Sequence, residues 1–147
     1  MKLPLLALLA TALPLAAHAD VTVSDPWARA SILASRPAAA YLTLESDGGD
    51  RLIAARTPVA GGVMVHMTET DDAGLGRMKH VTRVDLPAEE AVTFAPGGMH
   101  LMLTSLSEKL VEGTSFPLTL RFETAGEVTV DVPVLGAGAS GPEGGQQ

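Results

Sequence analysis

The sequence predicts an all-β fold in a single domain, a sandwich or a barrel with little helix. Short segments rich in β-branched residues recur along the chain, and turn signals separate them. Several segments alternate apolar and polar residues, as a strand does when only one of its faces is buried. No stretch has a sustained 3.6-residue period, which argues against long helices.

The expected strands follow one another closely along the chain. Segments 41–45 and 128–132 alternate most clearly, and each is expected to bury one face against the core. Between the last two strands, residues 123–127 include a glycine and are typical of a β-hairpin turn. In order, we expect strands near residues 21–24, 27–31, 39–46, 51–57, 62–69, 77–84, 91–94, 100–105, 116–123 and 127–134.

Residues 1–19, MKLPLLALLATALPLAAHA, have the pattern of a cleaved secretory signal peptide. A charge at Lys2 precedes an apolar stretch of Leu and Ala, and the final Ala-His-Ala is a small-residue cleavage site. A membrane anchor needs about 20 apolar residues, whereas this stretch is shorter and is interrupted by Pro4 and Pro14. We therefore expect an exported, soluble protein of the periplasm.

The remaining chain is expected to form one domain over residues 20–135, followed by a flexible glycine-rich tail over residues 136–147. The formal net charge is −7, with 17 acidic and 10 basic residues. An acidic chain lacks the basic surface of a nucleic-acid-binding protein and the Lys/Arg face of an interfacial membrane helix. We expect neither a nucleic-acid partner nor membrane insertion after the signal peptide is removed.

The chain contains no motif for a common catalytic mechanism. It has no G-x-S-x-G nucleophile turn, no phosphate-binding loop and no H-E-x-x-H pair. It also has no cysteine, which excludes disulfides, thiol nucleophiles and the thiolate ligand of a blue-copper centre. We therefore do not expect an enzyme, and any soft metal ligand has to be a methionine.

Methionine and histidine are concentrated in one part of the chain. Methionines that only fill a core would be scattered among strands on both sides of this region. Two of the clustered residues, His100 and Met102, stand two positions apart in an expected strand and so share one face. The clustering indicates a metal site, beside the alternative of incidental core and surface residues. After the signal peptide, every methionine and histidine lies between residues 64 and 102: Met64, His66, Met67, Met78, His80, Met99, His100 and Met102.

The softness of these ligands favours copper(I). Thioethers bind hard ions such as Mg²⁺ and Ca²⁺ poorly, whereas Cu(I) accepts methionine and histidine readily. Zinc sites usually contain Cys, His or carboxylate ligands rather than a majority of thioethers. A neutral His/Met set also suits a monovalent ion. The residues therefore favour Cu(I) binding without redox cycling.

The spacing of these residues is a further observation. His66-Met67, ten residues, Met78, twenty-one residues and His100-Leu101-Met102 follow one another in order. This pattern resembles the H(M)-x10-M-x21-H-x-M signature of the PCuAC family of periplasmic copper(I) chaperones, and the similarity extends over about residues 24–133. The resemblance implies a cupredoxin-like β-sandwich or barrel. It also implies delivery of copper to cytochrome c oxidase, notably to its dinuclear copper site.

The resemblance implies one Cu(I) per monomer, held by His66, Met78, His100 and Met102. Accessory candidates are Met64, Met67 and His80. Met64 is expected on the face of His66, and His80 on the face of Met78. Met67 matches the bracketed position of the signature, but strand alternation puts it opposite His66, so we expect it to pack in the core.

Two further residues are expected to have structural roles. Met99 is expected on the core face of its strand, because it alternates with His100. Trp27, the single tryptophan, matches a family position and is expected to be buried for structural reasons.

Three functions stay open from the sequence. The first is a metallochaperone, a monomer that passes Cu(I) by ligand exchange to the copper-site subunit of cytochrome c oxidase or to an assembly factor that supplies it. The second is a periplasmic copper-scavenging or tolerance protein with the same site and no dedicated acceptor. The third is a structural β-sandwich in which the methionines and histidines are incidental.

Overall fold

The computed structural model describes residues 20–142 and contains ten β-strands and no helix over that range. The all-β prediction is confirmed. Over the same residues there is accordingly no helix with the length and apolar character to span a bilayer. The expected signal peptide and the last five residues of the expected tail lie outside the described residues. The strands are β1 Val21–Arg29, β2 Ala38–Ser46, β3 Asp50–Arg56, β4 Ala60–Thr70, β5 Gly76–Val81, β6 Val84–Leu86, β7 Val92–Phe94, β8 Met99–Leu106, β9 Ser115–Phe122 and β10 Gly126–Leu135.

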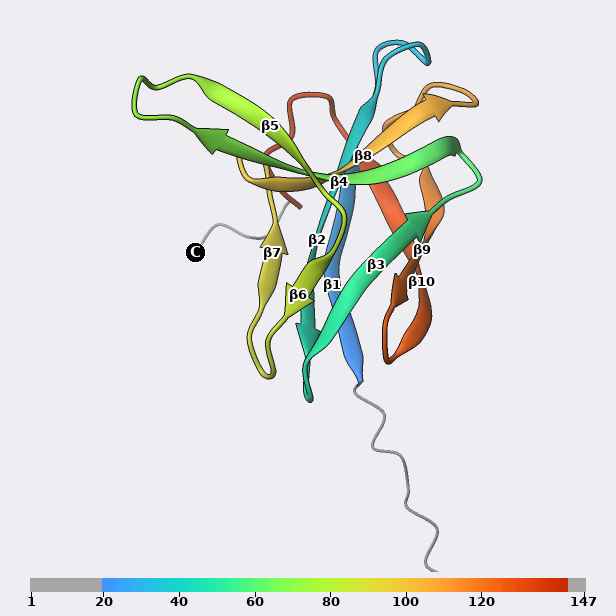
Figure 1. Ribbon diagram of the computed structural model, residues 1–147. Helices are drawn as coiled ribbons and strands as arrows, with labels where there is room; N and C mark the ends of the chain where they lie inside the picture. Colours follow the sequence, from blue (N-terminus) through green and yellow to red (C-terminus); the bar gives the residue numbers. More distant parts are fainter. Residues whose placement is uncertain (1–19, 143–147) are drawn as a thin grey trace, which may run out of the picture.

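The strands form one continuous sheet in the order β5-β4-β8-β2-β1-β10-β9-β3-β6, with β7 paired to β2 beside this path (Figure 1). A parallel pairing of β1 with β10, at Ala28–Val134 and Arg29–Leu135, joins the two halves of the sheet. The first half runs from β5 to β1, and the second half runs from β10 to β6. Strand β5 is therefore an edge strand of the first half.

A single apolar core lies between the two halves. Side chains from both halves belong to one packed cluster, so the inner face of each strand is set by which of its residues enter that cluster. Strand β8 contributes Leu101 and Leu103, both fully buried. Because side chains alternate across a strand, His100 and Met102 lie on the outer face of the same strand. Other members of the cluster are Leu42, Leu44, Leu52, Phe94, Phe116, Leu118, Leu120, Val132 and Val134.

The two strands expected at 21–24 and 27–31 are one strand, β1. Its pairing with β2 shifts register between Ser24 and Trp27, and Asp25 has a φ of 49°. Pro26 has no N–H to give to the ladder, and a β-bulge accommodates the interruption without ending the strand. The sequence pattern showed the interruption and not the continuity of pairing across it.

The strand expected at 77–84 is two strands, β5 and β6. Strand β5 pairs with β4 in the first half of the sheet, whereas β6 pairs with β3 in the second half. The chain crosses between the halves at residues 82–83. Val81 and Val84 stand three positions apart across this crossing, so the two-residue alternation is interrupted there. The interruption alone does not indicate which strand each part pairs with.

The hairpin expected at residues 123–127 is confirmed between β9 and β10. Gly126 has a φ of +79°, a conformation that glycine adopts without strain. The carboxylate of Asp50 accepts hydrogen bonds from the backbone N–H groups of Thr124 and Ala125, at 2.9 and 2.8 Å. Burial alone would raise the pKa of Asp50, but these backbone hydrogen bonds and that of the Arg51 N–H outweigh it and lower the pKa.

Candidate metal centre

Three histidines form a row across the outer face of β5, β4 and β8. His66 on β4 lies directly opposite His80 on β5 and directly opposite His100 on β8. The ring centroids are 5.7 Å apart for His66 and His80, and 5.8 Å apart for His66 and His100. The pairing register therefore gathers three imidazoles that are up to 34 residues apart in the sequence.

Three methionines share this face with the histidines. Met64 on β4 lies opposite Met102 on β8, one row from the histidines. Met78 on β5 lies opposite Thr68 on β4, one row away on the other side. The four ligands predicted from the sequence therefore share one face of three neighbouring strands, together with the accessory candidates Met64 and His80.

The remaining two methionines of the cluster lie on the opposite face of the same strands. Met67 and Met99 face each other across β4 and β8. Met99 packs against the apolar core, as the sequence predicts. Met67 is half-buried on that same face, so alternation separates it from His66 as expected.

Local structure fixes the position of Met78 at the edge of the sheet. The β4–β5 hairpin, which projects from the rest of the fold in Figure 1, turns at residues 71–75. The Asp71 carboxylate closes this turn by accepting the N–H groups of Ala73 and Leu75 at 3.0 and 2.9 Å. Closing the turn in this way sets the register that places Met78 and His80 on the same face as His66.

A close approach of two strands supports the inner part of the site. A Cβ atom on Gly62 of β4 would lie 2.9 Å from the Thr104 hydroxyl oxygen of β8. The Thr104 hydroxyl donates a 3.4 Å hydrogen bond to the Gly62 carbonyl. Glycine at this position therefore allows β4 to lie close against β8 next to Met64 and Met102.

Exposure of the donor side chains increases from β8 towards β5. His100 is buried, with 7% of its surface exposed. His66, Met64 and Met102 are half-buried. On the edge strand, His80 is exposed and Met78 is 63% exposed. One end of the cluster is thus covered by protein, and the other end is open to solvent.

The environment of His66 favours a neutral ring with a free lone pair. Burial lowers the pKa of His66, and proximity to His100 and His80 lowers it further. His66 Nδ1 is buried and has no hydrogen-bond partner anywhere in residues 20–142. His100 Nδ1 lies 3.2 Å from the Gly98 carbonyl oxygen, which can only accept, so in the neutral tautomer that makes this contact Nδ1 carries the proton and Nε2 has the lone pair.

The donor chemistry of this face fits a soft monovalent ion. A buried, unpaired nitrogen beside neutral thioethers is a costly arrangement unless a ligand satisfies it. Within the part of the chain that the structure describes, no group of three or more His, Cys, Asp or Glu side chains is arranged to hold a metal ion. The candidate site combines nitrogen donors with methionine sulfurs, as the sequence analysis proposed for Cu(I).

Two aromatic residues, Trp27 and Tyr41, lie on β1 and β2 in the same half of the sheet as the histidines. Trp27 on β1 is buried, as expected, and stacks on Tyr41 of β2 with ring centroids 4.4 Å apart. The Arg29 guanidinium lies 5.8 Å from the centroid of the Tyr41 ring. The Arg29 side chain also donates a 2.8 Å hydrogen bond to the Ala139 carbonyl, so it links β1 to the segment after β10. Sequence analysis did not identify this Trp27–Tyr41 pair, because it depends on the pairing of β1 with β2.

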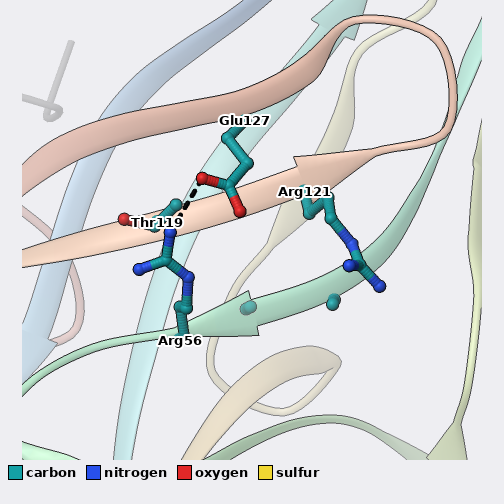
Figure 2. Close-up of a pocket in the computed structure, with 6 residues that line it drawn as sticks. Arg56, Thr119, Arg121 and Glu127 are labelled. Carbon is teal, nitrogen blue, oxygen red and sulfur yellow. Dashed lines mark hydrogen bonds and ion pairs between the residues drawn. The ribbon is translucent and has the colours of Figure 1, made fainter.

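A separate cavity lies in the second half of the sheet. It has a volume of about 130 Å³ and is lined by residues of β3, β9 and β10. Figure 2 shows Arg56 paired with Glu127, at 2.7 Å, and the Arg121 side chain extending away from that pair. None of the residues that sequence analysis selected lines this cavity, and its charged groups are largely solvated or already paired.

Comparison with protein families gives one assignment over most of the chain. Residues 21–134 match the family described as "Putative lipoprotein LpqE-like". A curated relative is "Putative lipoprotein Lxx21020" of Leifsonia xyli subsp. xyli (strain CTCB07). It is 29% identical over 116 residues, which cover 78% of this chain and 69% of the relative.

Solved structures of similar sequence have the same fold. The copper-bound PCuAC domain from PmoF2 is 31% identical, with a TM-score of 0.67 over 82% of this chain and 97% of that domain. Its apo form has a TM-score of 0.69 at 30% identity, over 85% of this chain and 97% of that domain. The Cu(I) form of DR1885 from Deinococcus radiodurans is 32% identical, with a TM-score of 0.58 over 86% of this chain and 81% of that protein.

Proposed function

The chain belongs to the LpqE-like family and to the PCuAC family, and on that premise we propose that it binds one Cu(I) per monomer and passes it on as a metallochaperone. The proposed ligands are His66, Met78, His100 and Met102. One observation carries the proposal: these four donors lie on one face of three adjacent strands, with a buried and unpaired nitrogen on His66 at their centre.

The imidazole and thioether ligands have different roles in the proposed binding. The two imidazoles supply nitrogen lone pairs, and the contact with the Gly98 carbonyl orients the His100 ring. The two thioethers supply soft sulfur donors that do not titrate, so they favour Cu(I) over hard ions at any pH. All four groups are neutral when they bind, and the ion keeps its charge and oxidation state throughout.

Ligand exchange is the proposed route of transfer. Met78 is 63% exposed at the sheet edge, so an incoming donor of an acceptor protein can reach the bound ion there without opening the core. The acceptor then takes over the remaining bonds one at a time, and no electron or proton transfer is required. We propose no catalysed reaction for this chain.

We propose the periplasm as the compartment and the dinuclear copper site of cytochrome c oxidase, or an assembly factor that supplies it, as the destination. The relation to proteins described as lipoproteins supports export. The proposed destination is testable in the native organism. Deletion of the gene should reduce the copper content and activity of the oxidase when copper is scarce. Unchanged oxidase copper together with lower copper tolerance would identify a scavenging protein instead.

Binding itself is tested with the purified protein. Anaerobic titration with Cu(I) against a chromophoric chelator should saturate at one equivalent, and Zn²⁺ should not displace the bound ion. Saturation at another stoichiometry, or a preference for Zn²⁺, would contradict the proposed site.

A further inference from the structure

His80 is the one imidazole of the row that the proposed ligand set leaves unused. It faces His66 across β4 and β5 at a ring-centroid separation of 5.7 Å, almost the same as the 5.8 Å that separates His66 from His100. It also shares its strand face with Met78, two residues away. Its position therefore duplicates that of His100 on the other side of His66.

The three imidazoles do not converge on one point. Strands β5 and β8 flank β4 on opposite sides, so His80 and His100 are separated by two strand spacings, roughly 10 Å between backbones. Consistent with this, no group of three or more His, Cys, Asp or Glu side chains in residues 20–142 is arranged to hold a single ion. An ion bound near His66 can therefore use the imidazole on one side or the imidazole on the other.

The two sides differ in exposure. On the inner side His100 is buried and Met102 is half-buried, whereas on the outer side His80 and Met78 are exposed on an edge strand. His66 stands between them and is half-buried. The donors therefore form a line that runs from a covered position to an open one, with a shared nitrogen ligand in the middle.

We infer that His80 forms a release position for Cu(I), in which the ion is held by His66, Met78 and His80. This inference rests on the proposed function. In the move outward, the bonds to His100 and Met102 break and a bond to His80 forms, while His66 and Met78 stay bound. Imidazoles and thioethers bind a metal ion as neutral donors, so the charge of the ion and its ligands does not change in this step.

Two physical arguments support such a position. An ion that keeps two ligands while others are exchanged avoids complete dissociation, which would otherwise set a high barrier to release from tightly bound soft ligands. The outer position is also on a strand without a second neighbour, where an acceptor side chain has access from the edge. The predicted role of His80 is kinetic, since the inner position remains the more completely ligated one.

The test separates rate from affinity. Purified wild-type protein and the variant His80→Ala are loaded with Cu(I), and transfer to a peptide with two thiolates is followed by anaerobic stopped-flow. His80→Ala should slow release by about tenfold or more. Its equilibrium Kd, measured by chelator competition, should stay within about threefold of wild type. Loading should slow by the same factor as release, because the ion enters and leaves by one route.

Two further variants give matched controls. His80→Met, which restores a soft donor, should recover most of the rate. Lys79→Ala alters the neighbouring residue of the same exposed strand, on the opposite face, and should leave both rate and Kd unchanged. An unchanged release rate in His80→Ala overturns the inference, and so does a rate change accompanied by a proportional change in Kd. Failure of the wild-type protein to bind one Cu(I) would instead refute the proposed function. The stoichiometry of the wild-type protein is therefore measured before the variants are compared.

Discussion

Replacement of Met102 by leucine separates a metal ligand from a packing residue. Met102 is half-buried on the outer face of β8, opposite Met64. Leucine has nearly the same volume, so the free energy of unfolding should fall by less than about 1.5 kcal/mol. Loss of the sulfur should weaken Cu(I) binding by about 100-fold, which corresponds to roughly 2.8 kcal/mol. The change in binding should therefore exceed the change in stability.

Met99→Leu is the matched control for this experiment. Met99 stands three positions earlier on the same strand, but it faces the core. Its replacement should cost similar or greater stability and leave the Cu(I) affinity nearly unchanged. Affinity is measured by anaerobic chelator competition and stability by urea denaturation of the apoprotein. A loss of binding in Met99→Leu with none in Met102→Leu would refute the assignment of faces on β8, and with it the ligand set.

Three further changes test the electrostatics and packing around the site. The pKa of His66 is lowered in the folded state, so the unfolded chain binds more protons than the folded one below about pH 6.5. The apoprotein should therefore lose stability as the pH falls from 7.5 to 5.5. In urea denaturation, His66→Gln should flatten that dependence. Asp50→Ala removes the acceptor for the Thr124 and Ala125 N–H groups and should lower the free energy of unfolding by about 1–3 kcal/mol at pH 7. Because the pKa of Asp50 is lowered, this loss relative to wild type should shrink only as the pH falls below about 4. A loss of the same size at about pH 3 would contradict this account. Gly62→Ala puts a Cβ 2.9 Å from the Thr104 hydroxyl oxygen and should cost about 1–3 kcal/mol. Thr104→Ala, which removes that oxygen, should reduce the cost in the double variant. A thermal melt of Gly62→Ala that matches wild type would contradict this account of the contact.

Most of the fold was accessible from local sequence patterns. Alternation and turn residues predicted the strands, because each depends on neighbours within a few positions. The two differences, the continuous β1 and the separation of β5 from β6, depend on which strand pairs with which. At residues 82–83 the chain changes its pairing partner from β4 to β3, and the identity of a partner strand is not encoded in the local pattern.

The candidate site could be predicted in composition but not in arrangement. Clustering and spacing selected the donor residues, and alternation placed His100 with Met102 on one face. The direct registration of His66 with both His80 and His100 could not be predicted, because register depends on turn geometry and on pairing over 34 residues. For the same reason, His80 stood out in the sequence only as the neighbour of Met78.

The core and the donor face are built from separate sets of side chains on the same strands. Folding of residues 20–142 draws on Leu101, Leu103 and their partners in the apolar cluster, and not on the side chains that would bind the ion. We therefore expect the protein to fold without copper, unlike a zinc finger, which needs its metal to fold. An empty carrier should persist as a folded protein during copper shortage, ready to be filled again. Loading should then raise its melting temperature only by the mass-action increment that the free Cu(I) concentration and the Kd dictate.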